Sequence, residues 1–186
     1  MEKKKERVLL HCCCAPDTTV PLMKLSMEGN EVLCAFYGSN IHPEEEYRWR
    51  LEEMKKVTAA FGADLKVLPY EPEEWLRFCH SLAGSREGGS RCGLCFALQL
   101  RAAARCAVEE GCESLCTTLT ISPHKNPLLI HRIGRAIAEK TGLYWIEKTW
   151  RKNGGFLESV LESRRLGLRR QTYCGCVYSR KGDETA

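Results

Sequence analysis

The sequence predicts a single α/β domain, over residues 1–186, with a mainly parallel sheet flanked by helices. Two observations carry this prediction. Short apolar runs alternate along the chain with longer segments of helical period, and the connections between them are short. The length of 186 residues is enough for one domain with a hydrophobic core but is seldom enough for two. Repeated strand-then-helix units favour a doubly wound sheet.

Strands are expected where short runs of Val, Leu, Ile and Cys are bounded by polar residues or glycine. In chain order they are Val8–Cys12, Glu31–Tyr37, Leu65–Leu68, Ser114–Thr118 and Leu143–Ile146. Helices are expected where a capping residue or proline begins a periodic segment and a glycine often ends it. In chain order they are a helix capped by Thr18 or Thr19 after a turn at Ala15–Asp17 and running to Glu28, then Pro43–Phe61, Glu73–Cys79, Arg91–Glu110 and Pro127–Thr141.

Two loops that follow strands are rich in reactive or polar side chains. The first is Cys12–Asp17, after the first strand, and the second is Thr120–Asn126, after the fourth. In parallel sheets, sites form beyond the carboxyl ends of the strands. We therefore expect both loops at one face of the molecule. The C-terminal tail after about Trp150 has no clear strand, and we expect it to lie over that active face.

The overall composition is that of an ordinary globular protein. Hydrophobic residues make up 44% of the chain, charged residues make up 28%, and the net charge is +4, which does not by itself indicate a nucleic-acid partner. No apolar run approaches the roughly 20 residues that span a bilayer. The apolar stretch Val8–Leu10 is too short for a signal-peptide core. A cytoplasmic protein with no membrane partner is expected.

Cysteine is the outlier of the composition, with 12 residues. In the reducing cytosol, clustered thiols are typical of metal ligands or redox catalysts. Half of them are instead interpreted as small apolar core residues, namely Cys12, Cys34, Cys79, Cys106, Cys112 and Cys116. The others form three pairs, which are Cys13-Cys14, Cys92-Cys95 and Cys174-Cys176.

The first two pairs together offer a site with four thiolates. Cys92 and Cys95 stand three apart at the start of a predicted helix, where they share one face and the helix dipole stabilises thiolates. Cys13 and Cys14 stand at a tight turn, where both can converge on one centre. Four cysteine ligands suit a [4Fe–4S] cluster and also suit tetrahedral zinc. The spacing leaves both open, and ordinary packing in a core is the alternative.

The third pair, Cys174 and Cys176, is separated by a glycine that permits a sharp bend. A disulfide across one residue is strained and easily reduced. Such a bond suits a two-electron relay better than a structural link. We favour a redox-active pair, and two further metal ligands are the alternative.

Two polar segments are further candidates. His124 and Lys125 lie in a loop that is suited to protonating a substrate or binding phosphate, although these residues alone favour a plain surface loop. Arg169 and Arg170 lie in a basic stretch directly before the third pair. Such a stretch can neutralise RNA phosphates, and its alternative is a solvated helix face.

Several common motifs are absent. The sequence has no P-loop, no GxGxxG, no HExxH and no serine nucleophile elbow. Nucleotide-dependent and hydride-transfer chemistry therefore have no positive support, and no NAD cofactor is expected.

In combination and in order, these motifs resemble the cobalamin-independent epoxyqueuosine reductases, the QueH family. The resemblance runs from Leu9 to Ser179. The stretches that carry it are His11–Asp17, Asn40–Pro43 with Glu46 and Tyr47, Arg91–Cys95, Thr117–Leu119 with Ser122–Asn126, Gly155 with Phe156, and Arg170–Ser179. Several motifs in a fixed order are more specific than any one of them. The extra thiol Cys12 departs from the family's pattern.

The resemblance implies a Rossmann-like fold and an oxidoreductase that reduces the epoxide of epoxyqueuosine at tRNA wobble position 34, giving queuosine. It implies a redox-active disulfide between Cys174 and Cys176. No cobalamin is expected, and an electron donor that the sequence does not name supplies the reducing equivalents. The implied ligands of a [4Fe–4S] cluster are Cys13, Cys14, Cys92 and Cys95.

Removing an epoxide oxygen as water takes two electrons and two protons, so the reaction needs a nearby acid. Asp17, His124 and His42 are the candidates. Asp17 is also a candidate ligand for a second iron beside the cluster. The expected RNA contacts are Lys125, Arg169 and Arg170.

Three rival functions fit parts of the sequence. A zinc- or cluster-stabilised module would hold tRNA without chemistry of its own. A small electron-transfer protein would carry a cluster and have no affinity for tRNA. An ATP-dependent tRNA-modifying enzyme on a similar fold is disfavoured, because no glycine- and serine-rich phosphate loop follows the first strand.

Overall fold

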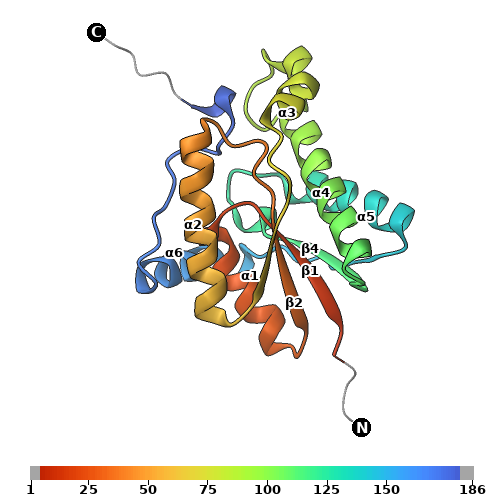
Figure 1. The fold of residues 1–186 in the computed structure, drawn as a ribbon, viewed down its shortest axis with the longest axis vertical. Helices are drawn as coiled ribbons and strands as arrows, with labels where there is room; N and C mark the ends of the chain where they lie inside the picture. The colour runs from red at the N-terminus through yellow and green to blue at the C-terminus, as the bar shows by residue number, and fades with distance from the viewer. Residues whose placement is uncertain (1–4, 181–186) are drawn as a thin grey trace.

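The computed structural model describes residues 5–180, which form a five-stranded sheet with helices on both faces (Figure 1). All strand pairs are parallel, in the order β3-β2-β1-β4-β5. The strands are β1 Arg7–Cys12, β2 Glu31–Phe36, β3 Asp64–Val67, β4 Ser114–Thr117 and β5 Tyr144–Trp145. The helices are α1 Ala15–Met27, α2 Glu44–Phe61, α3 Pro72–Cys79, α4 Ser90–Glu109, α5 Pro127–Thr141 and α6 Gly155–Arg165. The predicted α/β fold is confirmed.

Two layers of helices cover the sheet. Figure 1 shows α1, α2 and α6 on one side and α3, α4 and α5 on the other. Successive residues of β1 point to opposite faces, so Leu9 belongs to the core beneath α4, while Val8 and Leu10 belong to the core beneath α1 and α2. All three side chains are fully buried. An apolar central strand is expected in a parallel sheet that is covered on both faces.

The carboxyl ends of β1 and β4 are neighbours. The chain winds from β1 through β2 to β3 on one side, and then places β4 and β5 on the other. Doubly wound sheets form their sites at the point where the winding direction reverses. His11 is paired with Thr117 in the register, and Thr118 N donates to His11 O at 2.9 Å. The loops after β1 and β4 therefore start side by side, as predicted.

The first helix begins earlier than predicted. α1 begins at Ala15, directly after its extended N-cap residue Cys14, so the expected turn at Ala15–Asp17 is the first turn of the helix. A proline is tolerated there because the first turn leaves backbone donors unused. Thr18 and Thr19 lie inside the helix, where their hydroxyls donate to carbonyls one turn earlier.

Helix α6 was not predicted. Its buried positions are Gly155, Ser159 and Ser163, which are spaced four residues apart, and the helix packs on α1. Leu157 and Leu161 point outward and are 63% and 54% exposed. The small residues let α6 approach α1 closely. The buried face of α6 is therefore not apolar, and its leucines lie on the solvent face, so the usual apolar periodicity of a helix does not mark it.

The other predicted elements differ from the observed ones mainly at their ends. β5 is the most shortened, with Tyr144–Trp145 in place of Leu143–Ile146. Gly62 and Gly142 follow α2 and α5 in the left-handed conformation, with φ of 64° and 71°, as expected for helix ends. Over residues 5–180, no helix combines the length and apolarity needed to cross a bilayer.

Candidate thiol-rich active site

Cys13 and Cys14 lie between the end of β1 and the start of α1. Their sulfurs are 4.0 Å apart, and Cys13 Sγ lies 3.6 Å from Asp17 Oδ2, in the first turn of α1. One sulfur from each cysteine and one oxygen from Asp17 lie within 4.8 Å of one another. This is a group of metal-ligating atoms at a helix N-terminus, where the dipole favours negative charge.

The two adjacent thiols differ in acidity. Hydrogen bonding with Cys14 lowers the pKa of Cys13, although burial opposes this effect. The same contact, together with burial, raises the pKa of Cys14. Thr118 Oγ1 lies 3.3 Å from Cys13 Sγ and accepts the Cys13 backbone N–H at 3.2 Å. Cys13 is therefore the thiol of this turn that loses its proton more easily.

The loop after β4 brings a cation to these thiols. Lys125 is half-buried. Burial opposes its charge, but Coulombic interactions with Cys13, Cys174, Asp17 and Cys14 outweigh burial and raise the pKa of Lys125. The lysine therefore stays protonated among groups that can be negative.

Two side chains, Arg151 and Asn126, fix the loop that carries Lys125. Arg151 donates to the carbonyl oxygens of Ser122, Pro123 and Lys125 at 3.1, 3.1 and 3.0 Å. Asn126 Oδ1 accepts from two backbone N–H groups and caps α5. His124 lies in the same loop, but it is exposed, so the structure brings Lys125 rather than His124 against the thiols.

Cys92 and Cys95 lie in the first turns of α4, three residues apart on one face. Gly88 N donates to Cys92 Sγ at 3.2 Å, and Gln99 Nε2 donates to Cys95 Sγ at 3.0 Å. Burial raises the pKa of Cys95 above the usual range for thiols, and Cys174 adds to this effect. The observed helix start agrees with the position expected for this pair.

The Cys174–Cys176 loop is held by His42, just before α2, and by Arg50 on α2. His42 N donates to Gly175 O at 2.8 Å. Arg50 Nη1 donates to Cys174 O at 2.9 Å, and Arg50 Nη2 donates to Tyr173 O at 3.1 Å. Gly175 has φ of 128°, and a Cβ there would come within 3.0 Å of Arg50 Nη1. Glycine is therefore required for both the bend and the close approach of the guanidinium.

Both cysteines of this loop are free thiols in this structure. Cys176 is buried, and Cys174 is half-buried. Burial raises the pKa of Cys174 to about 11, with further contributions from Cys176, Cys13 and Cys92, while Lys125 opposes the rise. Cys174 therefore lies within electrostatic reach of both other cysteine pairs. It is a protonated thiol near neutral pH.

The C-terminal tail also closes on the first cysteine pair. Gln171 Nε2 donates to Cys14 Sγ at 2.8 Å. Arg169 Nη1 lies 3.3 Å from Glu46 Oε2, and its guanidinium lies 3.0 Å from the ring centre of Trp49. Arg170 lies 5.8 Å from the ring centre of Phe156. The two arginines that were expected to contact RNA thus have partners within the protein.

The three cysteine pairs share one end of the molecule, although they are not equally close. Cys13 and Cys92 pack against the core cluster that contains Cys95 and Cys176. Within residues 5–180, Cys13, Cys14 and Asp17 are the group of ligand atoms in close mutual contact, and the sulfurs of the CxxC pair lie outside it.

Four side chains support this site through contacts that the sequence did not predict, namely Arg50, Gln99, Thr118 and Gln171. Gln99 lies four residues after Cys95, so helical spacing alone places both on one face. Arg50 lies four residues after Glu46 and pairs with it at 2.8 Å. The contacts of Gln171 and Arg50 join distant parts of the chain, so no local sequence pattern predicts them.

A protein-family model described as "Epoxyqueuosine reductase QueH" matches residues 8–182. A protein of Thermotoga maritima with that name is 38% identical over 175 residues, covering 92% of this chain and 89% of the relative. A protein of Streptococcus pyogenes serotype M1 with the same name is 34% identical over 186 residues, covering 97% of this chain and 72% of the relative.

Two solved structures share the fold. One is a U34-tRNA thiolase, NcsA, from Methanococcus maripaludis with its [4Fe-4S] cluster, with a TM-score of 0.61 and 14% identity, covering 96% of this chain and 63% of that chain. The other is a predicted tRNA methyltransferase subunit from Methanocaldococcus jannaschii, with a TM-score of 0.50 and 9% identity, covering 85% of this chain and 75% of that chain. At these identities the likeness shows the fold alone.

Proposed function

The chain belongs to the epoxyqueuosine reductase QueH family and is an oxidoreductase, and we propose that it reduces the epoxide of epoxyqueuosine in tRNA to give queuosine. The reacting nucleoside is at wobble position 34. The observation that carries this proposal is the family match over residues 8–182, which includes all three cysteine pairs. The grouping of those pairs at one end of the sheet supports it.

A [4Fe–4S] cluster is the proposed cofactor, with the two cysteines after β1 and the two of α4 as its ligands. Such clusters need four thiolates and are tuned by hydrogen bonds to the sulfurs. Each proposed ligand has a hydrogen-bonding partner at its sulfur, and the pairs are Cys13 with Thr118, Cys14 with Gln171, Cys92 with Gly88 N and Cys95 with Gln99. Four such thiols have the donor chemistry that this cofactor needs, and the Cys92 and Cys95 sulfurs lie outside the close group of Cys13, Cys14 and Asp17. The tRNA thiolase that shares this fold carries a [4Fe-4S] cluster.

When bound, such a cluster supplies electrons one at a time. Asp17 is the proposed ligand for a second iron beside it, since its carboxylate oxygen lies 3.6 Å from Cys13 Sγ. The fixed positive charge of Lys125 offsets negative charge among these groups.

Cys174 and Cys176 are proposed to act as a redox pair. Their two thiols supply two electrons and two protons as one disulfide forms, and the epoxide oxygen leaves as water. A donor outside this chain then reduces the disulfide. Raising the pKa of Cys174 to about 11 keeps its proton on the sulfur, as this reaction requires.

The acid that passes one of these protons to the leaving oxygen is proposed to be Asp17, His42 or His124. Asp17 is buried beside Cys13, and His42 is half-buried beside the Cys174–Cys176 loop. His124 is the exposed member of the set. The residues proposed to contact tRNA phosphates are Lys125, Arg169 and Arg170.

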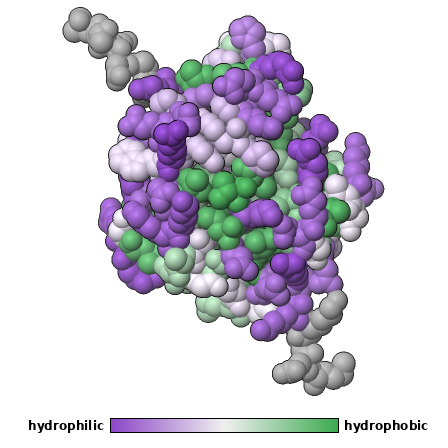
Figure 2. Space-filling view, viewed as in Figure 1, coloured by the Kyte–Doolittle hydropathy of each residue, from purple (hydrophilic) through white to green (hydrophobic). Residues whose placement is uncertain are grey.

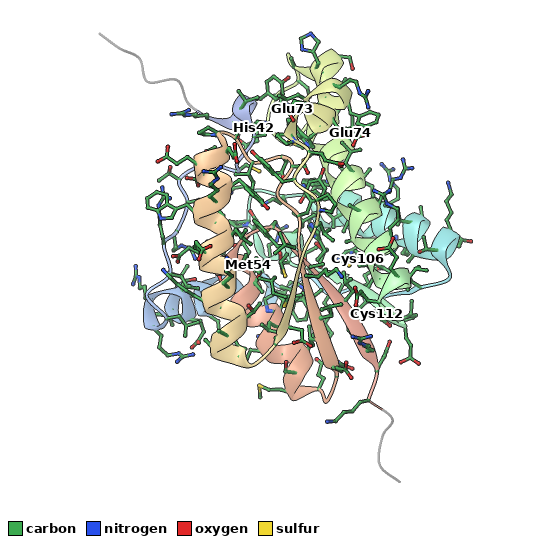
Figure 3. All side chains as sticks on the ribbon, viewed as in Figure 1. His42, Met54, Glu73, Glu74, Cys106 and Cys112 are labelled. Carbon is green, nitrogen blue, oxygen red and sulfur yellow. The ribbon has the colours of Figure 1, made fainter. Side chains whose placement is uncertain are left out.

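The test is anaerobic reconstitution with iron and sulfide, followed by single-turnover reduction of tRNA bearing epoxyqueuosine with a chemical reductant. The variant C174A/C176A should keep iron and sulfide and lose at least about a hundredfold in rate. The matched control C106A/C112A changes two cysteines at the opposite end of α4 (Figure 3) and should react like the wild type.

Three other results would overturn parts of the proposal. Undiminished turnover of C174A/C176A with the cluster intact removes the redox pair from the reaction. A colourless protein that contains zinc supports a binding module instead. A cluster protein without affinity for tRNA supports an electron-transfer protein.

A further inference from the structure

A groove of about 660 Å³ lies along α4, outside the thiol-rich site. It is lined by residues of α3, α4 and α5 and by the segments that follow β2 and β3. Leu98, Ala102 and Ile137 are partly buried residues of its lining. On the face seen in Figure 2, apolar side chains lie in the middle, with hydrophilic side chains on either side over α2 and α4. A groove of this size is large enough to bind a ligand.

Three exposed cations line the groove where α4 packs on α5, namely Arg101, Arg105 and Lys140. Arg101 and Arg105 are four residues apart, so they share one face of α4. In the part of the chain that the structure describes, none of the three forms an ion pair. Among residues 5–180, these three positive charges therefore have no acidic partner in contact, and the acids of the groove lining, Glu71 and Glu74, lie on the segment after β3 and on α3.

The exposed cations of α2 provide a comparison. Arg48, Lys55 and Lys56 each pair with a glutamate three or four residues away on the same helix. The exposed cations of this one helix are thus balanced by acids on the same helix. The imbalance along α4 and α5 points to a negatively charged ligand rather than to an ordinary charged surface.

The other end of the groove reaches the thiol-rich site. Trp75 lines this end, and its ring centre lies 5.4 Å from that of His42 and 6.2 Å from that of Tyr178, in the turn after Cys176. Phe78 also lines this end and is 44% exposed. Glu74 carries negative charge here and pairs with Arg77. Figure 3 labels Glu74, Glu73 and His42 at the same end of the molecule.

We propose that the groove binds the phosphate backbone of the tRNA substrate, with Arg101, Arg105 and Lys140 as its phosphate contacts. The inference rests on the proposed function and extends it from the reacting nucleoside to the rest of the RNA. Guanidinium groups bind phosphate oxygens in a bidentate manner, and an ammonium binds them as a point charge. Contacts of this kind position an RNA without reading its sequence.

Three features favour an RNA strand over an acidic protein segment. The cations come from two helices, which suits successive phosphates of one strand. The groove is continuous with aromatic side chains on which bases can stack, in particular Phe78. The positive charges lie along α4 and α5, and the acid Glu74 lies at the aromatic end. This separation suits a strand whose phosphates lie at one end of the groove and whose bases lie at the other.

The test compares tRNA affinity at several salt concentrations, by fluorescence anisotropy, with protein purified anaerobically. The variant R101Q/R105Q/K140Q should raise the Kd at least about tenfold at 0.1 M salt and lower the slope of log K against log salt by roughly 2 to 3. The variant R101K/R105K keeps the charges and should keep that slope. The matched control R48Q/K55Q/R135Q removes the same net charge from exposed, paired cations and should change the Kd less than twofold.

An unchanged Kd in R101Q/R105Q/K140Q, measured on protein whose melting temperature matches the wild type, overturns the inference. Equal losses in the matched control also overturn it, because net charge alone would then explain the effect. At saturating tRNA the groove variant should reduce the epoxide at the wild-type rate, since none of its residues contacts the thiols. If the wild-type protein does not reduce the epoxide, the proposed function is wrong. The affinity measurements would still decide whether the groove binds tRNA.

Discussion

Gln99 donates to the sulfur of Cys95 from inside the core, where both side chains are buried. The Oε1 of Gln99 and the Nε2 of His11 are buried without a hydrogen-bond partner within residues 5–180. Burial lowers the pKa of His11 to about 3, which keeps the ring neutral, and Gln99 opposes part of this shift. His11 Nδ1 in turn lies 2.9 Å from Thr117 Oγ1. Two separate polar contacts, Thr117 with His11 and Gln99 with Cys95, therefore lie in this part of the core.

Replacing Gln99 by leucine removes the N–H donor from the Cys95 sulfur and keeps a similar volume. Loss of such a supporting contact typically weakens metal binding by about tenfold or more. The reduction potential of a bound cluster should become more negative, because the hydrogen bond stabilises the more negative reduced state. Iron content and a redox titration followed by electron paramagnetic resonance check both effects. Unchanged values in folded Q99L would show that the amide has no role at the sulfur.

Residue chemistry explains what the sequence could predict of this site. Paired cysteines indicate metal binding or redox chemistry by their residue type alone. The position of Cys92 and Cys95 at the start of α4 was also predicted. A glutamine carries no such signal, so the contacts of Gln99 and Gln171 with cysteine sulfurs were not predicted, although Gln99 lies at helical spacing from a cysteine. Of the polar pair His124 and Lys125, only the structure shows which one faces the thiols.

At the scale of elements, α2 holds the Cys174–Cys176 loop. Arg50 and Glu46 form an ion pair at 2.8 Å with side chains only 6% and 9% exposed. The same guanidinium donates to two carbonyl oxygens of the loop and lies 5.2 Å from the ring centre of Tyr173. One buried residue thus joins a helix near the start of the chain to the proposed redox pair near its end.

Changing Arg50 to methionine should destabilise the protein by about 3 kcal/mol. Within the part of the chain that the structure describes, the buried carboxylate of Glu46 would then have only Arg169 as its cationic partner, at 3.3 Å. Alkylation of Cys174 should become faster as the loop loses its anchor. Urea unfolding and mass spectrometry of the alkylated protein check the two effects. The double variant E46Q/R50M should recover part of the stability but not the slow alkylation. Slow alkylation in both variants would contradict a positioning role for Arg50.

Local patterns predicted most elements, and long-range contacts account for the misses. Apolar runs and glycine or proline boundaries located the five strands and five of the six helices. Helix α6 was missed because its contact with α1 uses Ser159 and Ser163, which no apolar pattern marks. The contact between Arg50 and Cys174 spans 124 residues and has no local signal. Tertiary packing, rather than propensity, decided these features.

At the scale of the whole molecule, the cysteines divide between the site and the core. Figure 3 places Cys106 and Cys112 toward the C-terminal end of α4, away from His42, Glu73 and Glu74. Burial raises the pKa of Cys106 to about 11 and the pKa of Cys116 to about 12. The core thiols therefore hold their protons at a pH at which an unfolded chain, with a thiol pKa of about 8.5, loses them.

This difference predicts a loss of stability in alkali. A group whose folded pKa is raised contributes its full stability below the unfolded pKa, and loses it as pH rises toward the folded pKa. The free energy of unfolding should therefore fall between pH of about 8.5 and 11, by up to about 1.4 kcal/mol per pH unit for each such thiol. Urea unfolding under anaerobic, reducing conditions measures this slope. In C116A the free energy of unfolding should fall less steeply with pH than in the wild type, by up to about 1.4 kcal/mol per pH unit. Equal slopes would show that the Cys116 proton is not linked to folding.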